Sequence, residues 1–91
     1  MSKYKILIHR RVANFLKNLM NEKLKNKIKE SIEKLVDYPL ILRESDVEKL
    51  EGIERMYRIR LGEYRVIFYV DKKQKTIYVT HAGKRESIYE D

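Results

Sequence analysis

Residues 56 to 70 contain two runs in which apolar and polar side chains alternate, separated by the pair Gly62-Glu63. Successive side chains of a strand point to opposite faces, so each run can place one set of residues in a core and the other set on the second face. A two-residue connection that begins with glycine is typical of a type II′ turn, so strands at 56–61 and 64–70 are predicted to form an antiparallel hairpin. The predicted core set is Tyr57, Ile59, Leu61, Val66, Phe68 and Val70.

The second face of this hairpin carries three arginines, Arg58, Arg60 and Arg65. Their guanidinium groups repel one another, and a polyanion would offset that repulsion; RNA phosphate is the first candidate. The net charge of +7 agrees with such a partner. Acidic proteins and anionic membranes are the alternative partners of a basic chain.

The length of 91 residues predicts one domain spanning 1–91, and the composition excludes several classes of site. Without cysteine the chain can form neither a disulfide nor a thiolate zinc site, and its two histidines lie far apart in the sequence, so no metal is expected. Three glycines form no loop that could hold a phosphate, so no cofactor is expected. The absence of a long apolar run predicts a cytoplasmic protein without membrane association.

The remaining periodicities predict an α+β fold. A strand is predicted at residues 4–8, a helix at 12–20 that ends near Asn21 in a left-handed cap, and a second helix at 24–36 that Pro39 stops. Residues 40–55 are predicted to be a connector with one helical turn at 45–49, and residues 76–80 the last strand. The order is an N-terminal strand, an antiparallel helix hairpin and a three-stranded antiparallel meander, with the helices on one face of the sheet.

Three segments in this order resemble the RelE-type toxins of the RelE/ParE toxin–antitoxin superfamily: residues 49–52, 57–69 and 82–89. The resemblance implies a RelE-like fold and the toxin of a type II toxin–antitoxin pair. It also implies a ribosome-dependent endoribonuclease that cuts mRNA without a metal ion, and a RelB-like antitoxin that silences it.

The resemblance also assigns site residues. Arg58 and Arg60 stand where the best-known ribosome-dependent members carry lysines, and Arg65, Arg85 and Tyr89 match the family's two arginines and C-terminal tyrosine. These five are the predicted catalytic residues, and Arg58, Arg60 and Lys84 are predicted to bind RNA. Arginines suit the stabilisation of charge on a phosphorane, because their planar fork binds two phosphate oxygens, but an arginine is a poor general base.

Simpler structural roles remain open for several of these residues. Arg65 and Arg85 could only bridge surface carboxylates such as Glu63 and Glu86, and Tyr89 could only pack the tail onto the sheet. His81 is expected on the core side with Ile77 and Val79, unless the strand ends or bulges first. Two other functions also remain open: a ParE-like inhibitor of DNA gyrase without nuclease activity, and a basic RNA-binding module with a degenerate site.

Overall fold

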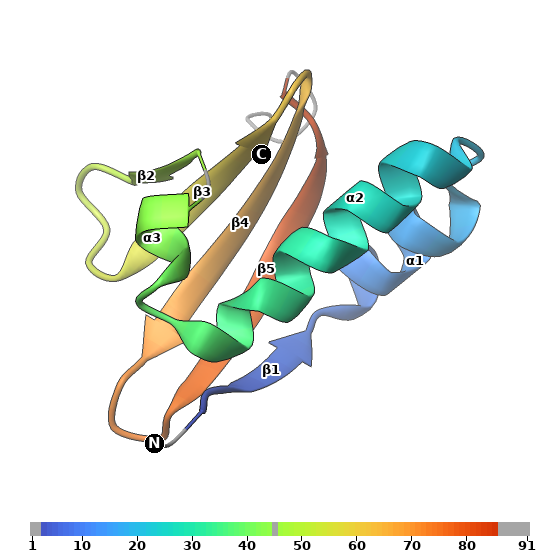
Figure 1. Ribbon diagram of the computed structural model, residues 1–91. Coiled ribbons are helices and arrows are strands. Elements are labelled where there is room, and N and C mark those ends of the chain that lie inside the picture. Colours follow the sequence, from blue (N-terminus) through green and yellow to red (C-terminus); the bar gives the residue numbers. More distant parts are fainter. Residues whose placement is uncertain (1–2, 45, 86–91) are drawn as a thin grey trace.

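The structure, a computed structural model, describes residues 3–44 and 46–85. Its elements are β1 (Lys5–Ile8), α1 (Arg10–Asn18), α2 (Glu22–Glu33), the 3₁₀ turn η1 (Lys34–Asp37), α3 (Ile41–Glu44), β2 (Val47–Lys49), β3 (Met56–Leu61), β4 (Tyr64–Asp71) and β5 (Thr76–Lys84). The strands form one five-stranded sheet. In Figure 1, α2 crosses in front of this sheet and runs antiparallel to α1. The α+β prediction is confirmed.

The strands follow the order β1-β5-β4-β3-β2, so the first strand of the chain lies beside the last. β1 pairs with β5 in parallel, while the other neighbours are antiparallel. The hairpin of β3 and β4 has the predicted two-residue loop, because Leu61 pairs with Tyr64. Gly62 has φ of 63°, the left-handed value that favours glycine at this position.

The core between helices and sheet contains the predicted alternate residues of the hairpin. Ile59, Val66, Phe68 and Val70 have no exposed surface, and Tyr57 and Leu61 pack against them. The helices contribute Val12, Leu16, Ile28, Ile32 and Leu35, and β5 contributes Ile77 and Val79. The core therefore fixes which side chains of each strand must lie on the other face.

A chain of aromatic rings closes one end of this core. Tyr38 packs edge-on against Tyr4 at 5.2 Å between ring centroids and against Tyr57 at 6.2 Å, and Tyr57 stacks on Phe68 at 5.4 Å. The hydroxyls of Tyr38 and Tyr57 lie 3.4 Å apart. Burial, together with this hydrogen bond, raises the pKa of Tyr38 well above its usual value.

Two predictions about the helices need correction. Asn21 does not end the first helix in a left-handed conformation; it has φ of −79°, and its side chain caps the start of α2 by accepting a hydrogen bond from the backbone N–H of Leu24 at 3.0 Å. The second helix becomes a 3₁₀ turn after Glu33. Tyr38 then adopts an extended conformation, as expected for a residue before proline.

The connector was also predicted wrongly in part. The helical turn expected at residues 45–49 lies earlier, at Ile41–Glu44, and Val47–Lys49 instead forms the edge strand β2 beside β3. Three residues are too short for an alternating pattern to reveal a strand, and this strand is held by its pairing with β3. It matters for function because Glu48 in β2 and Asp46 just before it bring two carboxylates beside β3.

Candidate nucleic-acid interface

The face of the sheet that points away from the helical core is here called the arginine face. Its side chains form rows across β3, β4 and β5, because residues paired between neighbouring strands point to the same side. The rows are Met56, Tyr69 and Tyr78; then Arg58, Ile67 and His81; then Arg60, Arg65 and Gly83. The face therefore changes from aromatic and apolar at one end to basic at the other.

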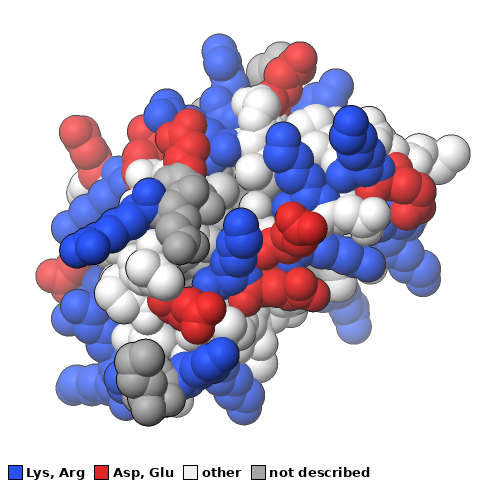
Figure 2. Space-filling model, in the orientation of Figure 1, with Lys and Arg blue, Asp and Glu red and all other residues white. Residues whose placement is uncertain are grey.

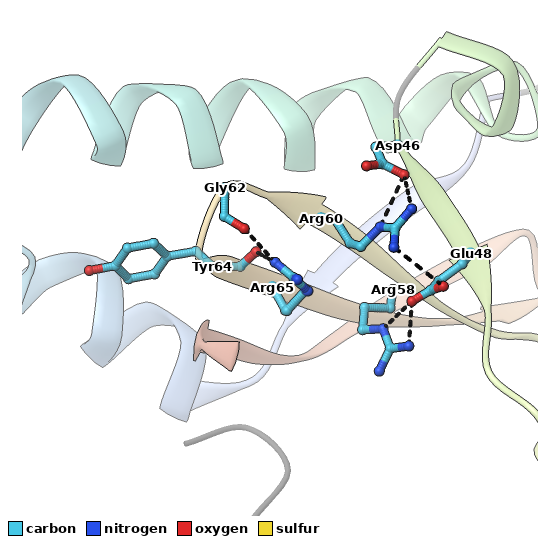
Figure 3. Close-up of polar contacts among 7 residues, drawn as sticks. All are labelled: Asp46, Glu48, Arg58, Arg60, Gly62, Tyr64 and Arg65. Carbon is cyan, nitrogen blue, oxygen red and sulfur yellow. Dashed lines mark hydrogen bonds and ion pairs between the residues drawn. The ribbon is translucent and has the colours of Figure 1, made fainter. Parts of the chain in front are cut away.

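Glu48 in edge strand β2 and Asp46 just before it add a carboxylate to each of the two basic rows. Glu48 pairs with Arg58, whose Nε donates to the Glu48 carboxylate at 2.9 Å and whose Nη2 contacts the same oxygen (Figure 3). Arg60 donates to Asp46 through Nε at 3.1 Å and Nη2 at 2.9 Å, and its Nη1 lies 3.9 Å from Glu48. The repulsion among the arginines is thus offset within the chain, where the sequence suggested that a polyanion would offset it.

The two ion pairs differ in their contact with solvent. The side chains of Arg58 and Glu48 are 19% and 36% exposed, whereas those of Arg60 and Asp46 are 44% and 58% exposed. Sequence reasoning missed both carboxylates because it did not predict β2. Their spacing of two residues, equal to that of Arg58 and Arg60, is the signal that could have found them.

Arg65 is buried at the turn end of the hairpin, with 8% of the residue exposed. Its Nη1 donates to two backbone carbonyls, Gly62 at 2.7 Å and Tyr64 at 2.8 Å (Figure 3). Neither contact is with the Glu63 carboxylate, so they do not support the alternative that Arg65 only bridges Glu63. Carbonyl oxygens carry only partial charges, so these two contacts hold the guanidinium in place without an ion pair to a carboxylate of the described residues.

The other predicted site residues are not all on this face. Lys84 pairs with Tyr64 and lines a hollow on the helix side together with Leu24 and Lys27, so it does not share a surface with Arg58 and Arg60. Arg85 is exposed at the end of β5, and its backbone N–H donates to the carbonyl of Glu63 at 2.9 Å. Tyr89 lies outside the described residues.

His81 lies on the arginine face, contrary to the expectation that it shares the core side with Ile77 and Val79. The pairing changes register so that Phe68 pairs with Val79 but Ile67 pairs with His81, which leaves Thr80 as an extra residue. Such a bulge reverses the alternation of the strand. The exception noted from the sequence, a bulge before His81, is therefore what the structure contains.

The aromatic row forms a shallow apolar hollow next to the basic rows. Tyr69 and Tyr78 lie 6.2 Å apart between ring centroids, and Tyr69 is exposed. Leu7 and Met56 help to line the hollow, whose volume is about 440 Å³. A flat aromatic surface beside cations suits single-stranded nucleic acid, whose bases stack while its phosphates bind arginine.

Charges on the helix side are mixed. In Figure 2, acidic side chains stand among Lys and Arg over the helices, so the positive charge there is partly balanced within the same surface.

Among residues 3–44 and 46–85, no three His, Asp or Glu side chains form a group that could hold a metal ion. No helix in the described part of the chain is long and apolar enough to cross a membrane.

Comparisons with known proteins extend the similarity over nearly the whole chain. The family model described as the ParE toxin of the type II toxin-antitoxin system parDE matches residues 6–89. The RelE1 protein of Methanocaldococcus jannaschii is 35% identical over 89 residues, which cover 98% of each chain.

Solved structures give the same result for the fold. A chain in the archaeal RelE-RelB complex from Pyrococcus horikoshii is 34% identical, with a TM-score of 0.77 over 93% of this chain and 97% of that chain. A chain of the intact E. coli RelBE complex has a TM-score of 0.73 at 22% identity, covering 89% of this chain and 95% of that chain, and shares the fold. The similarity first seen in short motifs thus includes the whole arrangement of helices and sheet.

Proposed function

The chain belongs to the RelE/ParE superfamily of toxins from type II toxin–antitoxin systems, and from that premise we propose that it is a ribosome-dependent mRNA endoribonuclease. It inhibits translation by cutting mRNA without a metal ion, through attack of a ribose 2′-hydroxyl on the neighbouring phosphate. The site of this reaction is the basic end of the arginine face.

The single observation that carries the proposal is the guanidinium of Arg65, which two backbone carbonyls hold in place among the basic rows of the sheet. A preorganised cation stabilises the charge that develops on a phosphorane, because no reorganisation is needed as the reaction proceeds. Arg85 supplies a second cation from the end of β5, and Tyr89 stacks on a base. Arg58 and Arg60 bind neighbouring phosphates once these replace the carboxylates of Glu48 and Asp46.

The partner that controls the toxin is a RelB-like antitoxin. The Pyrococcus horikoshii relative is in a complex with RelB, which supports the same kind of partner for this chain. The toxin acts in the cytoplasm, where the ribosomes are. A small antitoxin with an acidic segment fits a basic sheet face, and such segments often fold only on binding.

The test is primer extension on a translated message after brief induction of the toxin. New 5′ ends within the coding region are expected for the wild type, and none for the same message when its start codon is removed. Arg65→Ala should lose the ends, whereas the control Lys73→Ala, an exposed residue in the turn between β4 and β5, should keep them. A message that stays intact during growth arrest would refute nuclease activity.

A second function, inhibition of DNA gyrase, is favoured by one observation: the matching family model bears the name of ParE. The two functions separate in a direct assay. Purified toxin should leave supercoiling by gyrase unchanged if it is a nuclease. Loss of supercoiling, with messages intact, would identify a gyrase inhibitor.

A further inference from the structure

We propose that His81 is the general base of the cleavage reaction and that Arg11, at the start of α1, binds the phosphate whose neighbouring 2′-hydroxyl His81 deprotonates. This inference rests on the proposed nuclease function and supplies the base that the arginines cannot provide. Arginine stays protonated at ordinary pH, so Arg58, Arg60 and Arg65 can bind phosphate but cannot accept a proton. Neither Arg11 nor His81 belongs to the residues that the sequence motifs assign.

The contact between the two residues is direct. Nη1 of Arg11 lies 2.9 Å from Nε2 of His81, although the residues are 70 positions apart in the sequence. The start of α1 is held beside β5, because the backbone N–H of His9 donates to the carbonyl of Val79 at 3.0 Å. His9 also fixes Arg11 itself, since its Nδ1 accepts hydrogen bonds from the backbone N–H of Arg11 at 3.0 Å and from its Nε at 3.2 Å.

The hydrogen bonds around His81 assign its tautomer. Arginine only donates, so Nε2 of His81 accepts from Arg11 and carries no hydrogen. Nδ1 therefore carries the hydrogen and donates to Oγ1 of Thr80 at 3.0 Å, and the Thr80 hydroxyl donates to the carbonyl of Ile67 at 3.3 Å. The bulge at Thr80 thus turns the imidazole to the arginine face, and the contact with the Thr80 hydroxyl leaves the basic nitrogen directed at Arg11.

Gly83 lies two residues along β5 from His81 on the same face. It has no side chain, and an added Cβ there would meet no atom of the described residues within 4 Å. Arg65 pairs with Gly83, which makes Arg65 the diagonal neighbour of His81, a separation of about 7 to 8 Å between such positions. A phosphate bound between Arg11 and Arg65 would therefore lie next to the imidazole.

The proposed step begins when the phosphate draws the Arg11 guanidinium away from Nε2. Nε2 then takes the proton of the 2′-hydroxyl, and the 2′-oxygen forms a bond to the adjacent phosphorus. The bond from phosphorus to the 5′-oxygen breaks, and this oxygen takes up a proton from water. The products are a 2′,3′-cyclic phosphate and a free 5′-hydroxyl, and His81 returns its proton to the solvent.

Among the described residues, Arg11 from α1 contacts His81, and Arg65 from β4 is its diagonal neighbour on the arginine face. A general base works only in its unprotonated form, so cleavage should rise with pH over the range of about 5 to 8 in which histidine normally titrates, and then level off.

The experiment is single-turnover cleavage of mRNA on programmed ribosomes across that pH range. In His81→Gln the amide oxygen can still accept from Arg11 but cannot take a proton, so we expect a rate loss of about 10²-fold or more and no rising limb. Binding to the ribosome and thermal unfolding should be unchanged. In His81→Ala, added imidazole should restore part of the rate, which a merely structural histidine would not allow.

Arg11 is tested by Arg11→Gln, with Arg10→Gln as a control that removes the same charge from the neighbouring exposed position. Arg11→Gln should slow cleavage at saturating toxin, and Arg10→Gln should not. If wild type cleaves but His81→Gln keeps its rate and pH profile, the role of His81 is refuted while the nuclease function stands. If wild type does not cleave programmed mRNA at all, both are refuted.

Discussion

Replacing Glu48 by glutamine should tighten the binding of single-stranded RNA, because Arg58 must give up the Glu48 carboxylate before it can bind a phosphate. Hydrogen bonds to charged groups contribute about 1.5 to 3 kcal/mol, so the gain in affinity is at most roughly 10- to 150-fold. The equivalent change Asp46→Asn releases Arg60 from a more exposed pair. Such pairs contribute about 0.2 to 1 kcal/mol, which corresponds to roughly 1.4- to 5-fold.

The assay is fluorescence anisotropy of a labelled RNA oligomer, repeated over a series of salt concentrations. Each additional phosphate contact should steepen the dependence of log affinity on log salt by about 0.7. Glu54→Gln is the matched control, because it removes the same charge from the exposed loop between β2 and β3. Equal effects of Glu48→Gln and Glu54→Gln would show that only net charge matters, and unchanged affinity in Glu48→Gln would refute the competition.

Three further outcomes follow from the described contacts. Arg65→Ala should slow cleavage by about 10²-fold or more, with Arg65→Lys only partly active, in single-turnover assays. Gly62→Ala should lower the free energy of unfolding in urea by about 1 to 2 kcal/mol because of its positive φ, whereas Gly83→Ala, with open space and no such φ, should not. Because the pKa of Tyr38 is raised on folding, the folded state keeps a proton that the unfolded state loses; stability should therefore fall above about pH 10, and Tyr38→Phe should remove this component from alkaline melts.

Sequence patterns within short segments predicted the β3–β4 hairpin, whose conformation depends mainly on residues close together in the chain. Alternation placed Ile59 and Val66 in the core and the arginines opposite them, and a glycine-first pair predicted the hairpin loop. The edge strand β2 was missed because three residues carry little periodicity, and only β3 gives them their conformation. The carboxylates that neutralise Arg58 and Arg60 were missed with it.

The position of His81 could not be predicted for a related reason. A bulge is a property of two paired strands, so the residues of β5 alone do not reveal that Thr80 is the extra one. The contact of His81 with Arg11 depends on where α1 docks against β5, which only the packed core determines. The roles of Arg85 and Tyr89 stay predictions.

The parallel pairing of β1 with β5 affects the order in which the parts of the chain fold. The hairpin of β3 and β4 closes a loop of two residues, whereas β1 must find β5 across nearly the whole chain, and long loops close late because they lose more entropy. We expect the β3–β4–β5 meander to form first and the first strand and helix to dock afterwards. Arg11 would then join His81 only at the last stage of folding, so a partly folded chain would display the arginines but lack a complete cleavage site.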